Sequence, residues 1–599
     1  MREQVDLFFT IGALVAVAAV TIVAGLYGTR TRSTSDFLVA SRTMGPRWNA
    51  AAISGEFLSA ASFLGIAGLV LKGGVDALWY PIGFTAGYLA LLLFVAAPLR
   101  RSGAYTMPDF AEERLRSARL RKICTVFVII IGWLYLVPQL QGAGLTVATV
   151  SNSKYPPWVG AAVVMVIVTI NIYTGWMRSI TVVQAFQYWI KLTALAVPVF
   201  VLLIHYAGED KRFRDSLGAS APPSFAEATQ IRLDRDVVLQ VTEPTPLKIS
   251  TAGSPVAKVE TWQRGEHPVA TGTTLHFDVG SRVPVISGAA TDNDTWLRPL
   301  GSPSSGPVPS PLLATYSLVL ALMLGTMGLP HVLGRYYTNP DGLAARKTTL
   351  VVLALLGVFY LFPMISGWLA RLYVPQLLVT GNTDAALLLL PLAALGGWLG
   401  QLLAALIAAG AFAAFVSAAS GLVVSVAGAL SGDVLPGRLR SFKVATVAAW
   451  LVPLAFVLAV SSLDLAQGVG LAFAVAASSF CPLLVLGIWW RGLTDAGAAA
   501  GLLVGGGLAF AAVLPAAAGV LPPGWHEVAA QPAVFTVPLA FLTMVVVSRR
   551  TRDRVPIDVT RILLRLHAPD RLGLAEDRDI ARLGMAATLL RPRSGRHRR

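Results

Sequence analysis

The chain has 599 residues, of which 55% are hydrophobic and only 13% are charged. Soluble domains carry about 25% charged residues, so the composition excludes a water-soluble protein and indicates a polytopic membrane protein. A net charge of +16 would also suit a nucleic-acid partner. Here, however, the basic residues gather in loops and in the tail, as expected for a membrane protein. We therefore expect no nucleic-acid partner.

Thirteen apolar runs reach the roughly 20 residues that a membrane-spanning helix requires. The first run lacks a basic leading segment and a convincing cleavage site, so we interpret it as a retained helix rather than a signal peptide. The runs predict an all-α protein with about 13 transmembrane helices. The predicted spans are approximately 8–28, 48–71, 77–98, 123–149, 157–175, 182–206, 311–333, 348–372, 396–430, 443–462, 468–490, 498–519 and 532–548.

Arginine and lysine are distributed unevenly between the predicted loops. With the N-terminus outside, the short outer loops contain only Lys72 and Lys154, with Arg371 near a helix end. The positive-inside rule then predicts an outer N-terminus and a cytoplasmic C-terminus in a bacterial plasma membrane. The predicted inner loops hold Arg30, Arg32, Arg42, Arg47, Arg100, Arg101, Arg114, Arg116, Arg119, Arg121, Lys122, Arg178, Arg335, Arg346, Lys347, Arg438, Arg440, Lys443 and Arg491.

Two segments lie outside the predicted spans. The insert is rich in Pro, Gly, Ser and Thr, and its stretches DVVLQVT and TTLHFDV predict short strands in a small β-rich module. The tail is rich in arginine and has an amphipathic stretch near 556–567. We expect the tail to lie on anionic lipid, to be disordered, or to combine both. The chain thus divides into helices 1–206, an extracellular insert 207–310, helices 311–548 and a basic cytoplasmic tail 549–599.

The second predicted span contains polar residues in its middle. Glu56 is followed by Ser59 and Ser62. A carboxylate halfway across a bilayer is costly, so it normally faces a cavity that holds water or ions. We expect the helix to open at Gly55 and to expose backbone carbonyls there. Broken helices that coordinate a cation are typical of secondary transporters.

The spans also form two groups of five, helices two to six and seven to eleven. The first helix of the second group is interrupted as well, at LGTMGLPH, which contains Gly325, Gly328 and Pro330. Breaks at corresponding positions of two halves indicate a transporter binding site. A five-plus-five arrangement places the two halves in opposite orientations.

Several motifs together resemble the sodium:solute symporter family, and within it the cation/acetate (monocarboxylate) permeases. The resemblance implies the inverted five-helix repeat of leucine transporters, with one extra helix before the core and two after it. The insert resembles longer, actinobacterial-type members. The motifs, in chain order, are DFLVASRTMGPRWNAAAISGEFLSAASFLGIAGLV, SGAYTMPDF, TGWMRSITVVQAFQYW, GLPHVLGRYYTNPDGLAARKT, SAASGLVVSVAGALSGDVL and RGLTDAGAAAGLLVG.

The resemblance implies a sodium site between helices two and nine. Its ligands are carbonyls of Gly55 and Leu58, a carbonyl of Ala414 and the hydroxyl of Ser417. The sodium pattern has a second hydroxyl directly after the first, where this chain has alanine. Ser420, one turn further on, is an alternative oxygen donor. Both serines are otherwise explained as small residues that pack between membrane helices.

Both Na⁺ and H⁺ are candidates for the coupling ion. Gln184 stands where sodium-coupled relatives often carry an aspartate, and Lys191 follows about two turns later. A lysine on this helix replaces sodium in proton-coupled transporters of this fold. The alternatives are a lysine that extends to the interface or one that forms a structural pair. Glu56 either helps to bind the cation or proton, or caps amides exposed at the break.

The substrate is expected at mid-membrane between helices two and seven. Helix N-termini there carry partial positive charge and suit a carboxylate. The candidates are Ser59, Ser62 and the backbone from Gly325 to Gly328. His331 follows the second break and is either a structural hydrogen-bond donor or a titrating gate. Trp79 and Tyr80 either form an outer lid or are aromatic residues of the membrane interface.

These features predict a symporter that couples cation influx to the uptake of a short monocarboxylate such as acetate, propionate or pyruvate. The alternatives are a symporter of proline, pantothenate or a sugar, a transporter-like sensor, or a channel. We expect no catalysis, no cofactor beyond the coupling ion and no obligate protein partner, with the lipid bilayer as the surroundings. No GxxxxGK[ST] motif occurs, which argues against an ATP-driven pump.

Overall fold

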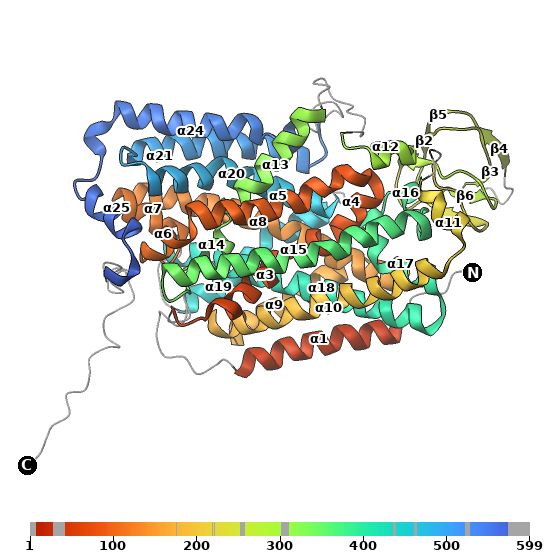
Figure 1. The fold of residues 1–599 in the computed structure, drawn as a ribbon, viewed down its shortest axis with the longest axis horizontal. Coiled ribbons are helices and arrows are strands. Elements are labelled where there is room, and N and C mark those ends of the chain that lie inside the picture. Colours follow the sequence, from red (N-terminus) through yellow and green to blue (C-terminus); the bar gives the residue numbers. More distant parts are fainter. Residues whose placement is uncertain are drawn as a thin grey trace, which may run out of the picture.

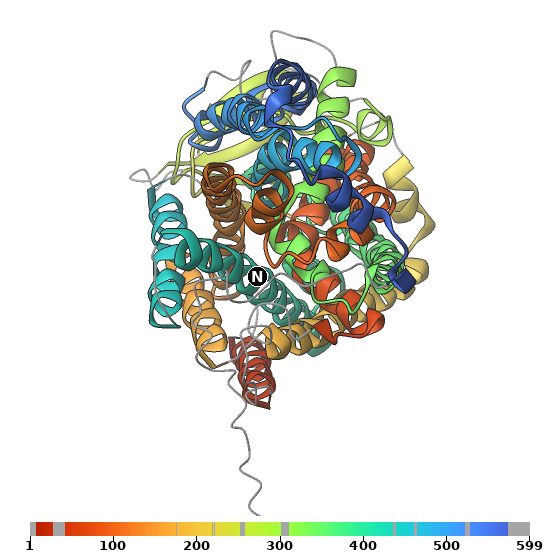
Figure 2. The same cartoon turned by 90° about the vertical axis from the view of Figure 1, so that its left-hand side faces the viewer.

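Helices run side by side along the longest axis of the molecule (Figure 1). The β-strands gather at one end of this helical body, here named the module end, and α25 lies at the opposite end, the tail end. Seen from the tail end, α1 and α24 lie on opposite sides of the bundle (Figure 2). The computed structural model describes residues 7–27, 42–174, 177–218, 220, 222–251, 258–300, 311–434, 439–459, 464–521 and 528–572.

The helical body is built mainly of long apolar helices. They confirm the predicted helical membrane class, and short β-sheets are present as expected. Its elements are α1 (Leu7–Tyr27), α3 (Pro46–Phe57), η2 (Ala61–Gly65), α4 (Ile66–Gly73), η3 (Gly74–Leu78), α5 (Trp79–Phe94), α6 (Ala96–Arg101), α7 (Met107–Leu115), α8 (Ala118–Val150), α9 (Trp158–Thr174), α10 (Met177–Gly208), α13 (Pro311–Gly328), α14 (Pro330–Tyr336), α15 (Gly342–Tyr373), α16 (Leu377–Thr380), η5 (Thr383–Ala385), α17 (Ala386–Leu395), α18 (Gly397–Ala429), η6 (Leu430–Val434), α19 (Leu439–Ala459), α20 (Leu465–Trp489), α21 (Asp495–Gly501), η7 (Leu502–Gly506), α22 (Gly507–Ala517), α24 (Ala533–Arg550), η8 (Arg552–Arg554), α25 (Val559–His567) and η9 (Asp570–Leu572).

The number of spans stays a prediction. Within the described residues, nine helices are long and apolar enough to cross a membrane, and one bent pair makes a tenth. The stretch Ala61–Phe94 counts there as a single helix, whereas the sequence predicted two spans, separated near Gly74. That glycine has a φ of +62°, which an L side chain rarely adopts, so the chain turns at this point.

Two of the helices are broken near their middle. The first break lies at residues 58–60, between α3 and η2, so the expectation that the helix opens at Gly55 was wrong. Gly55 lies inside α3, where an added Cβ atom would lie 2.1 Å from the Gln184 carbonyl oxygen. Glycine is therefore needed for close packing of α3 on α10. The second break was predicted correctly: α13 ends at Gly328, and the pair bends by 45°.

The insert forms two small antiparallel sheets, ordered β1-β6-β3-β4 and β5-β2-β7. The two predicted strands are present as β2 and β6. Buried side chains of the strands share a core with Val374 and Leu378 of the helical body, so the module packs directly on the helices. The strands are β1 (Thr229–Arg232), β2 (Val237–Val241), β3 (Thr245–Ser250), β4 (Lys258–Trp262), β5 (Gly265–Val269), β6 (Thr274–Phe277) and β7 (Val285–Ile286), preceded by α11 (Lys211–Asp215) and η4 (Ser216–Gly218).

A short helix after the strands, α12 (Asn293–Leu297), anchors the module. The indole of Trp296 is buried and donates a hydrogen bond to the Val70 carbonyl at 2.7 Å. The Arg371 guanidinium lies 5.1 Å from the Trp296 ring centroid and donates to the Asn293 side chain at 3.1 Å. The anchor thus joins the module to the ends of α4 and α15 that lie at the module end.

Replacement of Trp296 by alanine is expected to loosen the module, because truncation of a buried tryptophan costs about 3–5 kcal/mol. Limited proteolysis of the purified protein should then cut within 207–300 markedly faster than in the wild type. Trp398→Ala is the matched control, since Trp398 is 74% exposed. Equal cleavage rates in the two variants would contradict the anchoring role.

Candidate functional site

The first break surrounds the amino group of Lys191. This Nζ donates hydrogen bonds to the carbonyl of Gly55, to the carbonyl of Leu58 at 2.7 Å and to the hydroxyl of Ser417. The Ser417 hydroxyl in turn contacts the Gly55 carbonyl at 2.8 Å and the Ala414 carbonyl at 3.1 Å. The structure thus brings together four of the residues predicted to bind a cation, and it places an ammonium group among them.

The end of α3 explains why a cation fits here. The last carbonyls of a helix have no partner within that helix and carry partial negative charge. The break at residues 58–60 leaves such carbonyls at Gly55 and Leu58, far from water. Lys191 is fully buried, so the expectation of a side chain that extends to the interface was wrong. Its three N–H donors satisfy this site.

Ser420 does not join this cluster. Its hydroxyl donates to the Val416 carbonyl of its own helix at 2.6 Å. This geometry gives Ser420 the packing role that was weighed as the alternative, since serine in a membrane helix commonly bonds the carbonyl four residues earlier.

A buried ion pair lies next to the lysine. Arg335 of α14 donates from Nε to Glu56 at 2.6 Å, from Nη1 to the Thr181 hydroxyl at 2.7 Å and from Nη2 to the Gln184 side chain. Both charged side chains are 2% exposed. Gln184 also donates to the Ser417 carbonyl at 3.0 Å. A chain of hydrogen bonds therefore connects Lys191 with Glu56.

The sequence interpretation had assigned Arg335 to an inner loop, and this was wrong. The residue belongs to α14, which continues the broken helix for seven residues. The nearby glycine Gly421 makes room for the ion pair, because an added Cβ there would lie 1.8 Å from a Glu56 carboxylate oxygen. The signal that was overlooked is charge balance: a carboxylate buried in a membrane requires a cationic partner.

The predicted substrate residues fall into two groups. Ser59 and Ser62 lie at the break and are buried; Ser62 contacts the Tyr360 hydroxyl at 3.0 Å. Gly325 and Gly328 instead contact α20, where an added Cβ would lie 2.5 Å from a backbone oxygen in each case. The structure therefore gives these two glycines a packing role.

An aromatic cluster surrounds the break, and the sequence did not reveal it. The Phe57 ring makes edge contacts with Phe84, Tyr88 and Phe473, at 4.9 to 6.1 Å between centroids. The buried Tyr88 hydroxyl has no hydrogen-bond partner among the described residues. The Ser59 hydroxyl lies near the Tyr135 phenol but makes no hydrogen bond of ordinary geometry. Two buried hydroxyls thus remain available near the break.

The sequence also indicated three further aromatic residues near the site, His331, Trp79 and Tyr80. The His331 ring is 5.2 Å from the Tyr135 ring and is buried. Tyr80 packs on Phe84 with 6.3 Å between centroids, between the cluster and the module end, whereas Trp79 is only partly buried.

At the module end, a second acidic group is buried outside the spanning helices. Asp384 of η5 accepts a hydrogen bond from the Leu465 amide at 2.8 Å, and Lys72 pairs with Asp464 at 3.1 Å. Burial, reinforced by the Asp464 carboxylate, raises the pKa of Asp384 to about 7, against the opposing charges of Lys72 and Arg235.

Comparisons with known proteins show which proteins the chain is similar to. Residues 37–246 and 299–505 match the model of the sodium:solute symporter family. The chain is 30% identical to an uncharacterized symporter, YwcA, of Bacillus subtilis, over 82% of this chain and 83% of that protein. It is 27% identical to a monocarboxylic acid transporter of Corynebacterium glutamicum, over 86% of each.

A solved structure shows the fold. The structure of a Na⁺-coupled sialic acid symporter, in a substrate-bound outward-open state, matches with a TM-score of 0.59 and 14% sequence identity. The match covers 90% of this chain and 97% of that one. The predicted fold class, with inverted repeats of five helices, is therefore confirmed.

Loss of one partner of the buried ion pair is expected to destabilise the protein strongly. Glu56→Gln leaves the Arg335 guanidinium without its counter-charge, which costs about 3–5 kcal/mol. The double variant Glu56→Gln/Arg335→Gln should recover part of this loss. Thermal unfolding in detergent measures both, with Glu260→Gln in the exposed pair with Lys258 as control. Additive losses in the double variant would contradict direct pairing.

Stability is also expected to depend on Asp384. An acid whose pKa is higher in the folded protein than in the unfolded chain destabilises the fold while it is ionised. The folded state should therefore gain stability as the pH falls from about 8 to about 5, through the raised pKa. Asp384→Asn should remove most of this gain, and Asp234→Asn, at an exposed position, should not. A pH dependence that persists in Asp384→Asn would exclude Asp384 as its source.

Proposed function

Because the chain belongs to the sodium:solute symporter family, we propose that it takes up a short monocarboxylate, such as acetate, propionate or pyruvate, together with a cation. The similarity to a monocarboxylic acid transporter over 86% of both chains supports this substrate class. The small aromatic cluster with two available hydroxyls supports it too, since it suits a carboxylate with a short apolar chain. The protein acts as a transporter and carries out no covalent chemistry.

The proposed orientation places the module end outside the cell and the tail end in the cytoplasm. The supporting observation is charge. Basic residues are concentrated at the tail end, for example Arg100 and Arg101 of α6, Arg114 of α7 and Arg121 of α8. Such asymmetry normally marks the cytoplasmic side of a bacterial plasma membrane.

The position of Lys191 carries the proposal for the coupling ion. A sodium ion requires about five or six oxygen ligands. Here the oxygens of Gly55, Leu58 and Ser417 already accept hydrogen bonds from the Lys191 amino group. The positive charge of the ammonium group also repels a second cation. We therefore assign the proton, carried on Lys191, as the coupling ion.

Charge balance connects the proton to the substrate. The network contains Lys191, Arg335 and Glu56, so it carries one net positive charge while Lys191 is protonated. A monocarboxylate anion neutralises this charge. The electrostatic attraction between the two charges is much stronger in a low-dielectric site than in water. Loss of the Lys191 proton removes that attraction and favours release. Proton and anion thus bind together, as symport requires.

The hydrogen-bond chain transmits the state of Lys191 to the tail end. Gln184 contacts both Ser417 and Arg335, and the Arg335–Glu56 pair holds α14 against α3. These two half-helices would form the inner gate. Deprotonation removes the positive charge of Lys191 and one of its three N–H donors, so its hydrogen bonds to the α3 carbonyls become weaker. The α3–α10 contact then loosens and the gate opens.

At the second break, the N-terminus of α14 supports a place for the substrate carboxylate. Leu329 precedes the helix, and Pro330 occupies its first position without an N–H group. The partial positive charge of this terminus favours an anion. The hydroxyls of Ser59 and Tyr88 are additional donors, and the aromatic rings would contact the methyl or ethyl group of the substrate.

Uptake of labelled acetate into proteoliposomes tests the proposal. An inside-alkaline pH gradient without sodium should drive accumulation in the wild type. Accumulation is measured as the excess over protein-free liposomes, because undissociated acetic acid crosses the bilayer unaided and is trapped on the alkaline side. Lys191→Gln should abolish this excess but retain protein-dependent exchange of acetate, because the uncharged residue cannot carry the proton. Lys154→Gln, at an exposed position, is the control and should accumulate acetate normally.

Two results would contradict this account. Accumulation that requires a sodium gradient would exclude the proton as sole coupling ion. Uptake of proline or pantothenate, but of no monocarboxylate, would exclude the substrate class while leaving the coupling proposal intact.

A further inference from the structure

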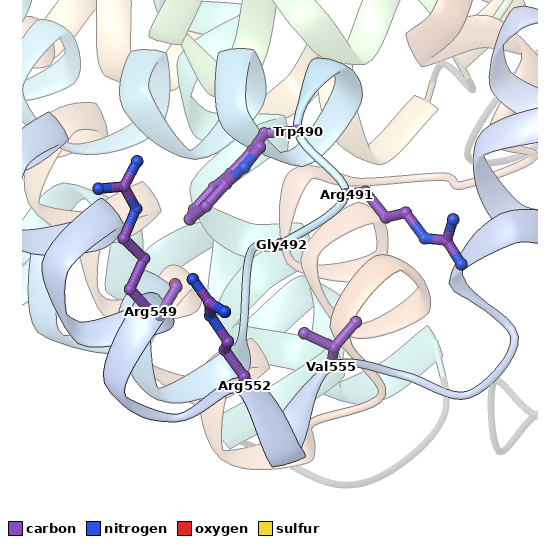
Figure 3. Close-up of a pocket in the computed structure, with 7 residues that line it drawn as sticks. Trp490, Arg491, Gly492, Arg549, Arg552 and Val555 are labelled. Carbon is purple, nitrogen blue, oxygen red and sulfur yellow. The ribbon is translucent and has the colours of Figure 1, made fainter.

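A basic pocket lies at the tail end, away from the broken helices. Its volume is about 430 Å³, and it lies between the loop that follows α20 and the end of α24. Trp490 and Gly492 of the loop line one side, and Ser548, Arg549 and Arg552 line the other. In Figure 3, Arg552 points toward the indole of Trp490 and Arg549 rises on the same side of it, whereas Arg491 points away.

The pocket wall is held by specific contacts. Arg114 of α7 donates to the Gly487 carbonyl at 2.7 Å and to the Trp490 carbonyl at 3.1 Å. The Thr494 amide donates to the Ser548 hydroxyl at 3.2 Å. An added Cβ on Gly492 would lie 2.8 Å from the Trp490 ring, so glycine is needed beside the indole. The loop therefore has a fixed shape against α24.

Among the described residues, no acidic side chain neutralises the charges of the pocket. Neither Arg549 nor Arg552 forms an ion pair with any residue in the described part of the chain. A basic residue in the last turn of α24 balances the helix dipole, which accounts for Arg549 in part. It does not account for Arg552, which follows the helix and points into the same pocket. Two adjacent guanidinium groups without a counter-ion favour an anionic ligand.

The surroundings place the pocket at the level of lipid headgroups. The neighbouring Trp489 is 51% exposed, and its indole donates to the Phe94 carbonyl at 3.0 Å. Exposed tryptophans are typical of the membrane–water interface. The nearby helix α25 is amphipathic, and its Val559, Ile562 and Leu566 are buried against the protein, so α25 covers this end of the helical body beside the pocket.

We propose that this pocket binds the phosphate group of an anionic phospholipid. Arg549 and Arg552 would hold the phosphate oxygens through charge-assisted hydrogen bonds. The Trp490 indole would contact the glycerol portion, and the acyl chains would continue into the bilayer beside Trp489. Such a lipid would join the α20–α21 loop to the end of α24. This site is independent of the proposed transport function.

Thermal unfolding of the full-length protein in neutral detergent tests the site. Dioleoyl phosphatidylglycerol should raise the unfolding temperature more than dioleoyl phosphatidylcholine does. The double variant Arg549→Gln/Arg552→Gln should lose most of this difference and weaken lipid retention about tenfold or more, as measured by native mass spectrometry. The matched control Arg550→Gln/Arg554→Gln removes the same charge from neighbouring positions outside the pocket and should behave like the wild type.

Three results would overturn the proposal. Equal losses in both double variants would show general surface electrostatics rather than a pocket. Equal stabilisation by inorganic phosphate or glycerol 3-phosphate, lost in Arg549→Gln/Arg552→Gln, would show a site for soluble phosphates. The absence of any difference between phosphatidylglycerol and phosphatidylcholine would show that the pocket does not select an anion. Each comparison uses the temperature increment caused by lipid, so a general destabilisation of a variant does not affect the conclusion.

Discussion

The structure depends on how backbone groups freed by a broken helix are satisfied inside a bilayer. Unpaired carbonyls cost several kcal/mol each where water is absent. At the end of α3 the carbonyls of Gly55 and Leu58 receive hydrogen bonds from the Lys191 ammonium group. A single side chain from α10 thus meets a requirement that a bound metal ion would otherwise meet. The freed carbonyls explain why a charged lysine is stable inside the protein, and the lysine explains why the helix can be broken at this point.

This arrangement makes the stability of the α3–α10 contact depend on one proton. The buried amine has three partners while it is charged, and the carbonyls lose donors when it is neutral. The Arg335–Glu56 pair adds a second connection between the same helices, through Gln184 and Thr181. Ion pairs in such surroundings contribute specificity rather than net stability. Here the pair fixes the positions of α3 and α14, the two half-helices nearest the tail end.

Much of the fold could be predicted from hydropathy and charge. The long apolar helices, the break at Pro330 and the strands of the insert depend on local patterns, which a sequence displays directly. The position of the first break could not be predicted, because a glycine that allows a helix to open resembles one that allows close packing. Gly55 serves packing, and the chain opens three residues later.

The site was predictable only in part, for a related reason. The family resemblance indicated Lys191 and the oxygens of Gly55, Leu58 and Ser417 separately, but their direct contact joins distant segments and follows from the fold. Arg335 was assigned to a loop because it follows an apolar run, whereas α14 carries it into the protein. The aromatic cluster around Phe57 unites residues from three helices, α3, α5 and α20, and no local pattern marks it.

The central claim is that the Lys191 ammonium group occupies the position of a sodium ion. Equilibrium binding of ²²Na⁺ to the purified protein tests this claim most directly, with Lys191→Ala alongside the wild type. The account predicts no saturable sodium binding to the wild type, and new binding in Lys191→Ala, where the oxygens of Gly55, Leu58 and Ser417 lose the competing cation. Saturable binding to the wild type that Ser417→Ala abolishes would contradict it.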